Sequence, residues 1–145
     1  MLIPIFIIGC ASKPDDQRQY ENSDLGIKFI IPNDWEVISS GSIGSMYSNL
    51  IRLGYFDPNS GERVGYFGIS TRNNPDSDEA KINLENKKKI EWKDKPCFYA
   101  NSTSETGMHY ESFTIIKNEE IIIMMIGYTE SHAGTVTNIL DNIIF

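Results

Sequence analysis

One uninterrupted apolar segment, residues 121–126 (IIIMMI), constrains the fold of this chain more than any other part of the sequence. Successive side chains of a β-strand point to opposite faces of a sheet, so this segment presents apolar side chains on both faces. A strand of this kind suits the centre of a sheet that is covered on each side, and it argues against an open sheet with one face in water. We therefore expect a layered domain with this segment in the middle of its sheet.

Turn residues divide much of the chain into pairs of strand-like segments. Residues 57–61 (DPNSG) are strong turn formers between two segments of strand character, 47–56 and 62–72, which predicts a hairpin. The same reasoning predicts hairpins that turn near residues 94–96 and 117–120. The expected sheet is therefore antiparallel, and its other strands are 27–31, 90–92, 97–102, 107–117 and 120–128.

The segment 74–79 (NPDSDE) predicts the start of a helix. Asp76 is the expected N-cap, and Glu79 three residues later completes a capping box. The helix should end near Asn86. The lysines that follow, residues 87–89, are expected to lie in solvent, where their charge compensates the negative end of the helix dipole.

A second helix is expected at the end of the chain, beginning near residues 130–131. Its apolar residues between 136 and 143 recur at helical spacing, so this helix should lie across the sheet. Residues 40–45 (SGSIGS) are instead expected to form a loop. They lack the Lys-Ser/Thr ending of a phosphate-binding loop, and the sequence contains no dinucleotide fingerprint, so no cofactor is expected.

The N-terminus has the pattern of a processed export signal. Residues 2–8 form an apolar run far too short to span a bilayer, and Gly9 is a small residue before Cys10. Residues 7–10 (IIGC) resemble the bacterial lipobox, in which the cysteine thiol receives a diacylglycerol and becomes the new N-terminus after cleavage. This resemblance implies a signal peptide over residues 1–9 and lipidation of Cys10, followed by a polar, proline-containing tether over residues 10–17.

One feature of this segment departs from an export signal. No Lys or Arg precedes the apolar run, whereas such signals begin with a positively charged region, so we expect the signal to be truncated in this sequence. The alternative is a buried N-terminal strand that contains an ordinary cysteine. With Cys10 acylated, Cys97 is the remaining thiol; it has aromatic neighbours and no nearby His, which favours a buried structural cysteine.

The net charge of −7 and the pI near 4.8 bear on the partners of the chain. An acidic protein repels phosphate backbones and anionic headgroups, so nucleic acid is not an expected partner and membrane attachment has to come from lipid. The expected location is the cell membrane or outer membrane, on the extracytoplasmic side.

The opening of the domain carries a second resemblance. Residues 20–35 follow the pattern Tyr-x-Asn-x-x-x-Gly-Ile-x-Phe-x-Ile-Pro-x-x-Trp, which resembles the first hairpin of PsbP-like domains, including bacterial DcrB-like lipoproteins. The resemblance implies a single α+β domain over residues 18–145, built as an α/β/α sandwich around an antiparallel sheet. Trp35 would close one edge of the core, and a Trp that stacks on a ligand is the alternative.

One group of polar residues could form a chemical site. His109 and Glu111 share a strand face, and Glu130 and His132 lie near the end of the paired strand, so the four could meet at a metal or acid/base site. The four residues do not show the spacing of a known metal-binding motif. The alternative is that they are ordinary polar residues on the exposed face of a strand. The resemblances to the lipobox and to PsbP-like domains imply a non-enzymatic binding or assembly module with an envelope protein as partner. A small-ligand receptor beside Trp35 and a metal-dependent hydrolase that uses His109, Glu111 and His132 are the alternatives.

Overall fold

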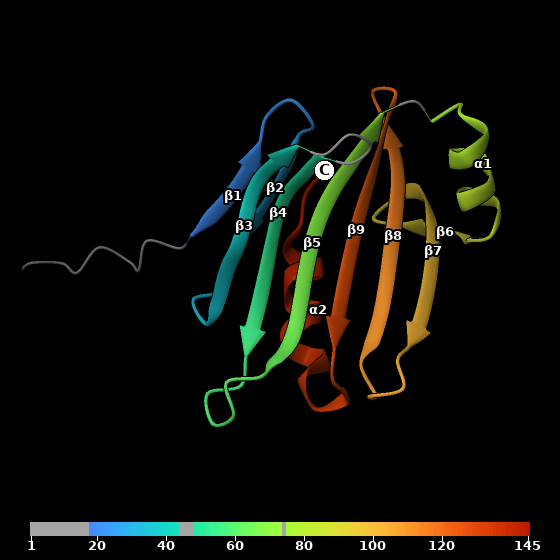
Figure 1. Cartoon of the computed structure of the whole chain (residues 1–145). Coiled ribbons are helices and arrows are strands. Elements are labelled where there is room, and N and C mark those ends of the chain that lie inside the picture. Colours follow the sequence, from blue (N-terminus) through green and yellow to red (C-terminus); the bar gives the residue numbers. More distant parts are fainter. Residues whose placement is uncertain (1–17, 44–47, 74) are drawn as a thin grey trace, which may run out of the picture.

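A seven-stranded antiparallel sheet forms the middle layer of the domain in the computed structural model, which describes residues 18–43, 48–73 and 75–145 (Figure 1). The strand order is β3-β4-β5-β9-β8-β7-β6, so β9, which contains the apolar segment 121–126, is the central strand as predicted. The strands are β3 (Trp35–Ile43), β4 (Ser48–Phe56), β5 (Arg63–Asn73), β6 (Lys88–Trp92), β7 (Lys95–Thr103), β8 (His109–Lys117) and β9 (Glu120–Tyr128).

One face of this sheet is covered over its central strands. A separate hairpin of β1 (Gln19–Asn22) and β2 (Ile27–Ile30) packs there beside α2 (Ala133–Asn142), which the chain enters through the short 3-10 helix η1 (Glu130–His132). Alternation along β2 buries Ile27 and Phe29, and the Phe29 ring meets Phe67 of β5 edge-on at 5.2 Å. We call this side the α2 face.

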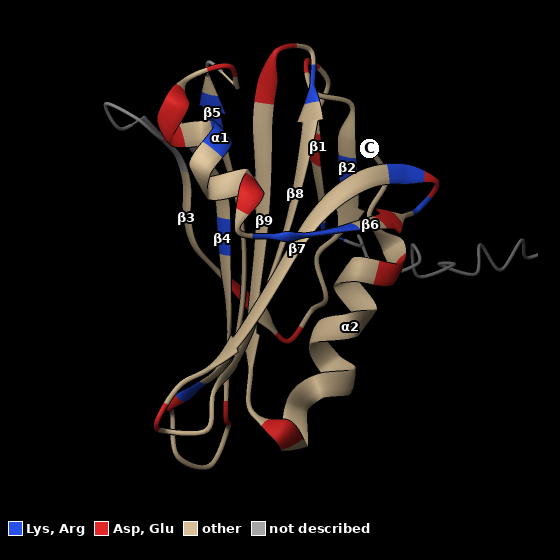
Figure 2. Ribbon diagram, turned by 90° about the vertical axis from the view of Figure 1, so that its right-hand side faces the viewer, with Lys and Arg blue, Asp and Glu red and all other residues tan. Residues whose placement is uncertain are grey.

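Among the described residues, the opposite side, the α1 face, carries one short helix, α1 (Asp78–Glu85). Figure 2 shows the two helices on opposite sides of the sheet, which makes the domain the α/β/α sandwich predicted for it. The coverage of the two faces is unequal, however. On β9, Met124 points to the α2 face and is 0% exposed, whereas its neighbour Met125 on the α1 face is 42% exposed.

The start of α1 differs from the prediction. Ser77, not Asp76, is the N-cap, because the Ser77 hydroxyl oxygen accepts a hydrogen bond from the Ala80 backbone N–H at 3.2 Å. Glu79 does not complete a capping box; its carboxylate pairs with the Arg72 guanidinium at 2.8 Å. The helix is therefore anchored to β5 by an ion pair.

Two further expectations about loops and helix ends were wrong. Of the loop predicted over residues 40–45, residues 40–43 belong to β3, where Ser40 pairs with Ile51 of β4, because cross-strand pairing outweighs the weak strand propensity of Gly and Ser. Residues 44 and 45 lie outside the described residues. Lys88 and Lys89 are exposed as expected, but they belong to β6 and not to the end of the helix. Lys87 follows the C-cap of α1, and its side chain is half-buried against the sheet instead of lying in solvent.

The predicted hairpins are all present. The 57–61 turn is closed by hydrogen bonds from the backbone N–H groups of Asn59 and Ser60 to the Asp57 carboxylate. In the turn between β6 and β7, Lys93 and Asp94 both have positive φ, as a two-residue turn of type I′ requires. Lys93 also donates through Nζ to the carbonyl of Ile143 at 2.7 Å, which ties this turn to the end of α2.

Candidate functional site

Trp35 is the first residue of β3 and lies in the core of the α2 face. It is 1% exposed, and its indole packs against the Tyr55 ring with centroids 5.8 Å apart. A Cβ atom on Gly65 would lie 3.1 Å from Cη2 of Trp35, so the absence of a side chain at Gly65 makes room for the indole. At this exposure Trp35 has almost no surface to offer a ligand.

His109 and Glu130 do meet. His109 Nε2 lies 2.8 Å from a Glu130 carboxylate oxygen, and its Nδ1 lies 3.1 Å from the Thr103 hydroxyl. The His109 side chain is one-third exposed and that of Glu130 is 91% exposed. A polar contact this open to solvent contributes little to stability.

Glu111 has other partners. One carboxylate oxygen accepts a hydrogen bond from the Tyr99 hydroxyl at 2.5 Å, and the other accepts one from the Tyr128 hydroxyl at 3.1 Å. These tyrosines come from the strands on either side of β8, so Glu111 links three neighbouring strands. Burial and the adjacent Glu111 carboxylate raise the pKa of Tyr99 to about 12, and the same two causes raise the pKa of Tyr128.

The contacts of Glu111 with Tyr99 and Tyr128 predict that the domain loses stability at alkaline pH. The folded protein holds the Tyr99 proton more tightly than the unfolded chain, whose tyrosine has a pKa of 10.0. This contribution to stability is therefore complete below pH 10 and is lost as the pH rises through about 12. Urea-unfolding midpoints measured across this range should fall with pH, and the fall should be shallower in Glu111→Gln, which keeps an acceptor but removes the negative charge. Tyr99→Phe should also flatten it; an unchanged slope in both variants would contradict this role.

His132 and Cys97 stand apart from these groups. His132 Nδ1 lies 2.7 Å from the Thr129 hydroxyl, and the imidazole packs against the Tyr55 ring. Cys97 is 2% exposed on β7, and burial raises the pKa of its thiol. Of the four residues expected to converge, only His109 and Glu130 are in contact. Across residues 18–43, 48–73 and 75–145, no group of three or more His, Cys, Asp or Glu side chains is placed to hold a metal ion.

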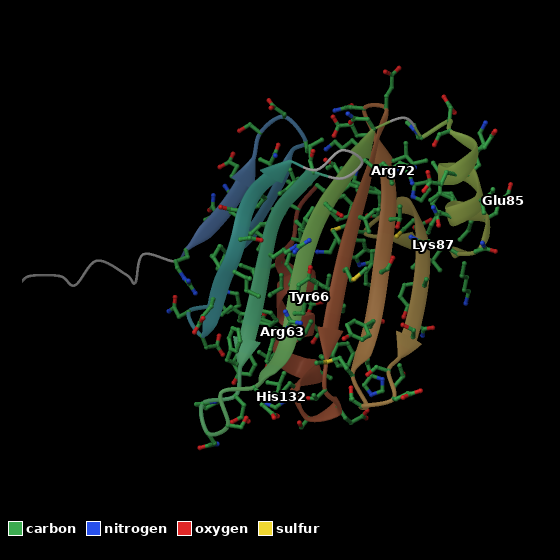
Figure 3. All side chains as sticks on the ribbon, viewed as in Figure 1. Arg63, Tyr66, Arg72, Glu85, Lys87 and His132 are labelled. Atoms are coloured by element: carbon green, nitrogen blue, oxygen red, sulfur yellow. The ribbon has the colours of Figure 1, made fainter. Side chains whose placement is uncertain are left out.

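A cavity lies on the other side of the sheet, between α1 and strands β5, β9 and β8. Its volume is about 260 Å³, and its floor is apolar, formed in part by Ile123 and Met125. Two cationic side chains line it, Arg72 from β5 and Lys87 from the segment that follows α1 (Figure 3). The cavity therefore combines an apolar floor with concentrated positive charge.

Lys87 is held in this cavity by two polar contacts with β8. Its ammonium group donates hydrogen bonds to the Thr114 hydroxyl at 2.8 Å and to the Ser112 hydroxyl at 3.3 Å. Burial lowers the pKa of Lys87 below its ordinary value, because the charged form loses hydration. Arg72 is 8% exposed, and its ion pair with Glu79 holds the guanidinium against the first turn of α1.

Below the cavity the α1 face continues as an open surface. Met125 and Ser112 are paired across β9 and β8, and they line both this cavity and a second hollow of about 210 Å³ that reaches Tyr110. The Tyr110 ring lies over Gly127, where a Cβ atom would come within 2.9 Å of the ring. Glycine thus allows an aromatic side chain to lie flat along the sheet at the end of the hollow.

The sequence prediction missed this cavity. Lys87 lies in a run of three lysines, and a charged run at a helix end is usually solvated, so nothing local marks Lys87 as buried. One signal was present in the sequence: β8 alternates polar and apolar residues, with Ser112 and Thr114 on the face opposite Phe113. Small hydroxyl residues facing an apolar central strand indicate a partly covered face.

Comparisons with known proteins were made by sequence and by structure. No family model matches the sequence, and no curated protein is significantly similar to it. In structure the chain is similar to the cyanobacterial PsbP (CyanoP) of Synechocystis sp. PCC 6803, with a TM-score of 0.59 and 10% identity over 92% of this chain and 95% of that one. It is also similar to a protein of Bacteroides thetaiotaomicron, with a TM-score of 0.53 and 10% identity over 88% of this chain and 48% of that one.

These similarities identify the fold and nothing finer. A third structure, LpqN of Mycobacterium tuberculosis, described as involved in cell envelope biogenesis, reaches a TM-score of 0.44 at 12% identity over 88% of this chain and 82% of that one, too low to support an argument. Neither helix in the described part of the chain is long and apolar enough to cross a membrane.

Proposed function

We propose that this chain, an α+β sandwich with the PsbP-like fold, is a lipoprotein of the bacterial cell envelope that acts as a non-enzymatic binding module. Cys10 carries the lipid, residues 10–17 are the tether, and the partner is an envelope protein and not a nucleic acid. Residues 1–17 lie outside the described residues, so the anchor rests on the lipobox pattern alone. Two or more acyl chains on one residue hold a protein firmly at a membrane.

The observation that carries the binding role is the unequal coverage of the sheet. On the α2 face the core is sealed, and Met124, Ile122 and Ile126 are 0% exposed. On the α1 face the sheet is left partly open below α1, with Met125 exposed between two adjoining hollows. A hollowed face that combines apolar and polar side chains is typical of binding sites.

The anchor can be tested by metabolic labelling. Cells that express the chain and grow with labelled palmitate should incorporate label into the wild-type protein, and Cys10→Ala should abolish it, because the thioether needs the Cys10 sulfur. Cys97→Ala is the matched control and should retain the label, since Cys97 is 2% exposed in the core. Continued labelling of Cys10→Ala would rule out the lipobox.

The binding face can be tested by site-specific photo-cross-linking in native membranes. A photoreactive residue at position 125, on the open α1 face, should give a reproducible protein adduct that mass spectrometry identifies. The same residue at position 144 is the control: Ile144 is 64% exposed but pairs with Lys28 of the layer on the α2 face. Adducts from position 144 and none from position 125 would contradict the assignment of the α1 face as the binding surface.

A further inference from the structure

We propose that the cavity between α1 and the sheet binds a small organic carboxylate, with the carboxylate group at Lys87 and Arg72 and the apolar part over Ile123 and Met125. This inference deepens the binding role proposed above and rests on it, since it adds a ligand class to the face assigned to binding.

The charge of the cavity is the first argument. Glu79 is a carboxylate partner of Arg72, and its side chain is 58% exposed, so it reaches in from the solvent side. In the described part of the chain no carboxylate lies within ion-pair distance of Lys87 Nζ, although the protein has seven more acidic than basic residues. A half-buried ammonium group without a carboxylate partner is stabilised by an anion that enters the cavity.

The hydrogen-bond donors around Lys87 are the second argument. The hydroxyl oxygens of Ser112 and Thr114 accept from Lys87, so their own O–H groups remain able to donate. An ammonium group has three N–H donors, and two of them are used in these contacts. Two hydroxyl protons and one ammonium proton can therefore converge on the oxygens of one carboxylate, in charge-assisted hydrogen bonds.

The size of the cavity and its apolar floor are the third argument, because they favour a ligand whose carboxylate is attached to a hydrocarbon part. A volume of about 260 Å³ corresponds to about nine water molecules at their share of liquid volume. The Ile123 and Met125 side chains favour a hydrocarbon part over a purely hydrophilic anion. The second hollow adjoins the first at Met125, so a chain that leaves the cavity continues along the sheet towards Tyr110.

Isothermal titration calorimetry with sodium octanoate tests this proposal on the full 145-residue chain carrying Cys10→Ala, which removes the lipid and keeps the domain. Octanoate should bind with one site per chain. n-Octanol should bind about tenfold more weakly or worse, because it lacks the charge that the ammonium group recognises. Inorganic phosphate should also bind more weakly, because it leaves the apolar floor uncovered. No octanoate binding, equal affinity for octanol, or equal affinity for phosphate would each overturn the proposal.

Two variants with matched controls locate the site. Lys87→Met keeps the length of the side chain and removes its charge, so octanoate affinity should fall about tenfold, whereas Lys88→Met, at the exposed next residue, should leave it unchanged. Asn83→Trp should block the cavity from the surface of α1, whereas Ile82→Trp, at a position 59% exposed on the same helix, should not. Unchanged affinity in both Lys87→Met and Asn83→Trp would place octanoate elsewhere.

These outcomes are independent of the anchor. Because the Cys10→Ala chain is not lipidated, a failed palmitate experiment leaves the calorimetry unaffected. A failed calorimetry experiment in turn leaves the palmitate label and the cross-link at position 125 standing, and would remove the carboxylate ligand alone.

Discussion

Replacing Met124 with alanine is expected to lower the free energy of unfolding by about 3 kcal/mol, whereas the same change at Met125 should lower it by less than about 1 kcal/mol. Both residues lie on the central strand, but Met124 is 0% exposed against α2 and Met125 is 42% exposed on the open face. The buried side chain leaves a cavity when it is truncated. Truncation of the partly exposed Met125 side chain removes less buried apolar surface, and water can fill the space that it leaves.

Urea unfolding followed by circular dichroism measures both effects, because a shift of the midpoint at constant slope is a change in stability. The pair is its own control, since the two variants make the same chemical change one residue apart. Equal destabilisation would show that the α1 face is covered at Met125, and the proposed binding surface would then be lost.

Trp35→Ala is expected to destabilise the domain by about 4 kcal/mol, a large share of the total stability of a domain of this size. The indole is 1% exposed and fills the space between Tyr55 and Gly65. Its Nε1 atom is buried without a hydrogen-bond partner among the described residues. Trp35→Phe removes that unsatisfied donor along with part of the ring, so its cost should be only about 1–2 kcal/mol.

The same urea experiment checks these values, with Glu36→Ala as the control because Glu36 is the exposed next residue on β3. The two outcomes for Trp35 separate packing from ligand contact. An unchanged midpoint in Trp35→Ala, together with weaker binding of a ligand or partner, would assign Trp35 to a binding site and contradict its place in the core.

The order of strands and helices could be predicted because its signals are local. Period-two alternation placed Ile27 and Phe29 on one buried side of β2, and turn residues placed each hairpin. The segment 121–126 identified the central strand because its composition reflects burial on both sides. The incomplete cover of that strand on the α1 face could not be predicted, since the exposure of Met125 depends on the short length of α1 and on its position over the sheet.

The partners of Glu111 and Lys87 could not be predicted, because they come from distant parts of the sequence. Alternation correctly put His109 and Glu111 on one face of β8, but the register of three strands decides that Glu111 meets Tyr99 and Tyr128. The burial of Lys87 was even harder to predict. Its burial depends on hydroxyl groups 25 and 27 residues away, and a run of three lysines gives no indication of them.

The two ends of the described chain are tied together, and this has a mechanical consequence. Lys28 of β2 and Ile144 exchange two backbone hydrogen bonds, of 3.0 and 2.8 Å, and the first hairpin makes a sheet of its own. In a protein held by its N-terminus, a pulling force enters through β1 and passes from β2 into the segment after α2. Arg18 also donates a hydrogen bond to the carbonyl of Trp35, so part of the force reaches β3, the edge strand of the seven-stranded sheet. Strand β4 lies between β3 and β5, the nearest strand that lines the cavity under α1.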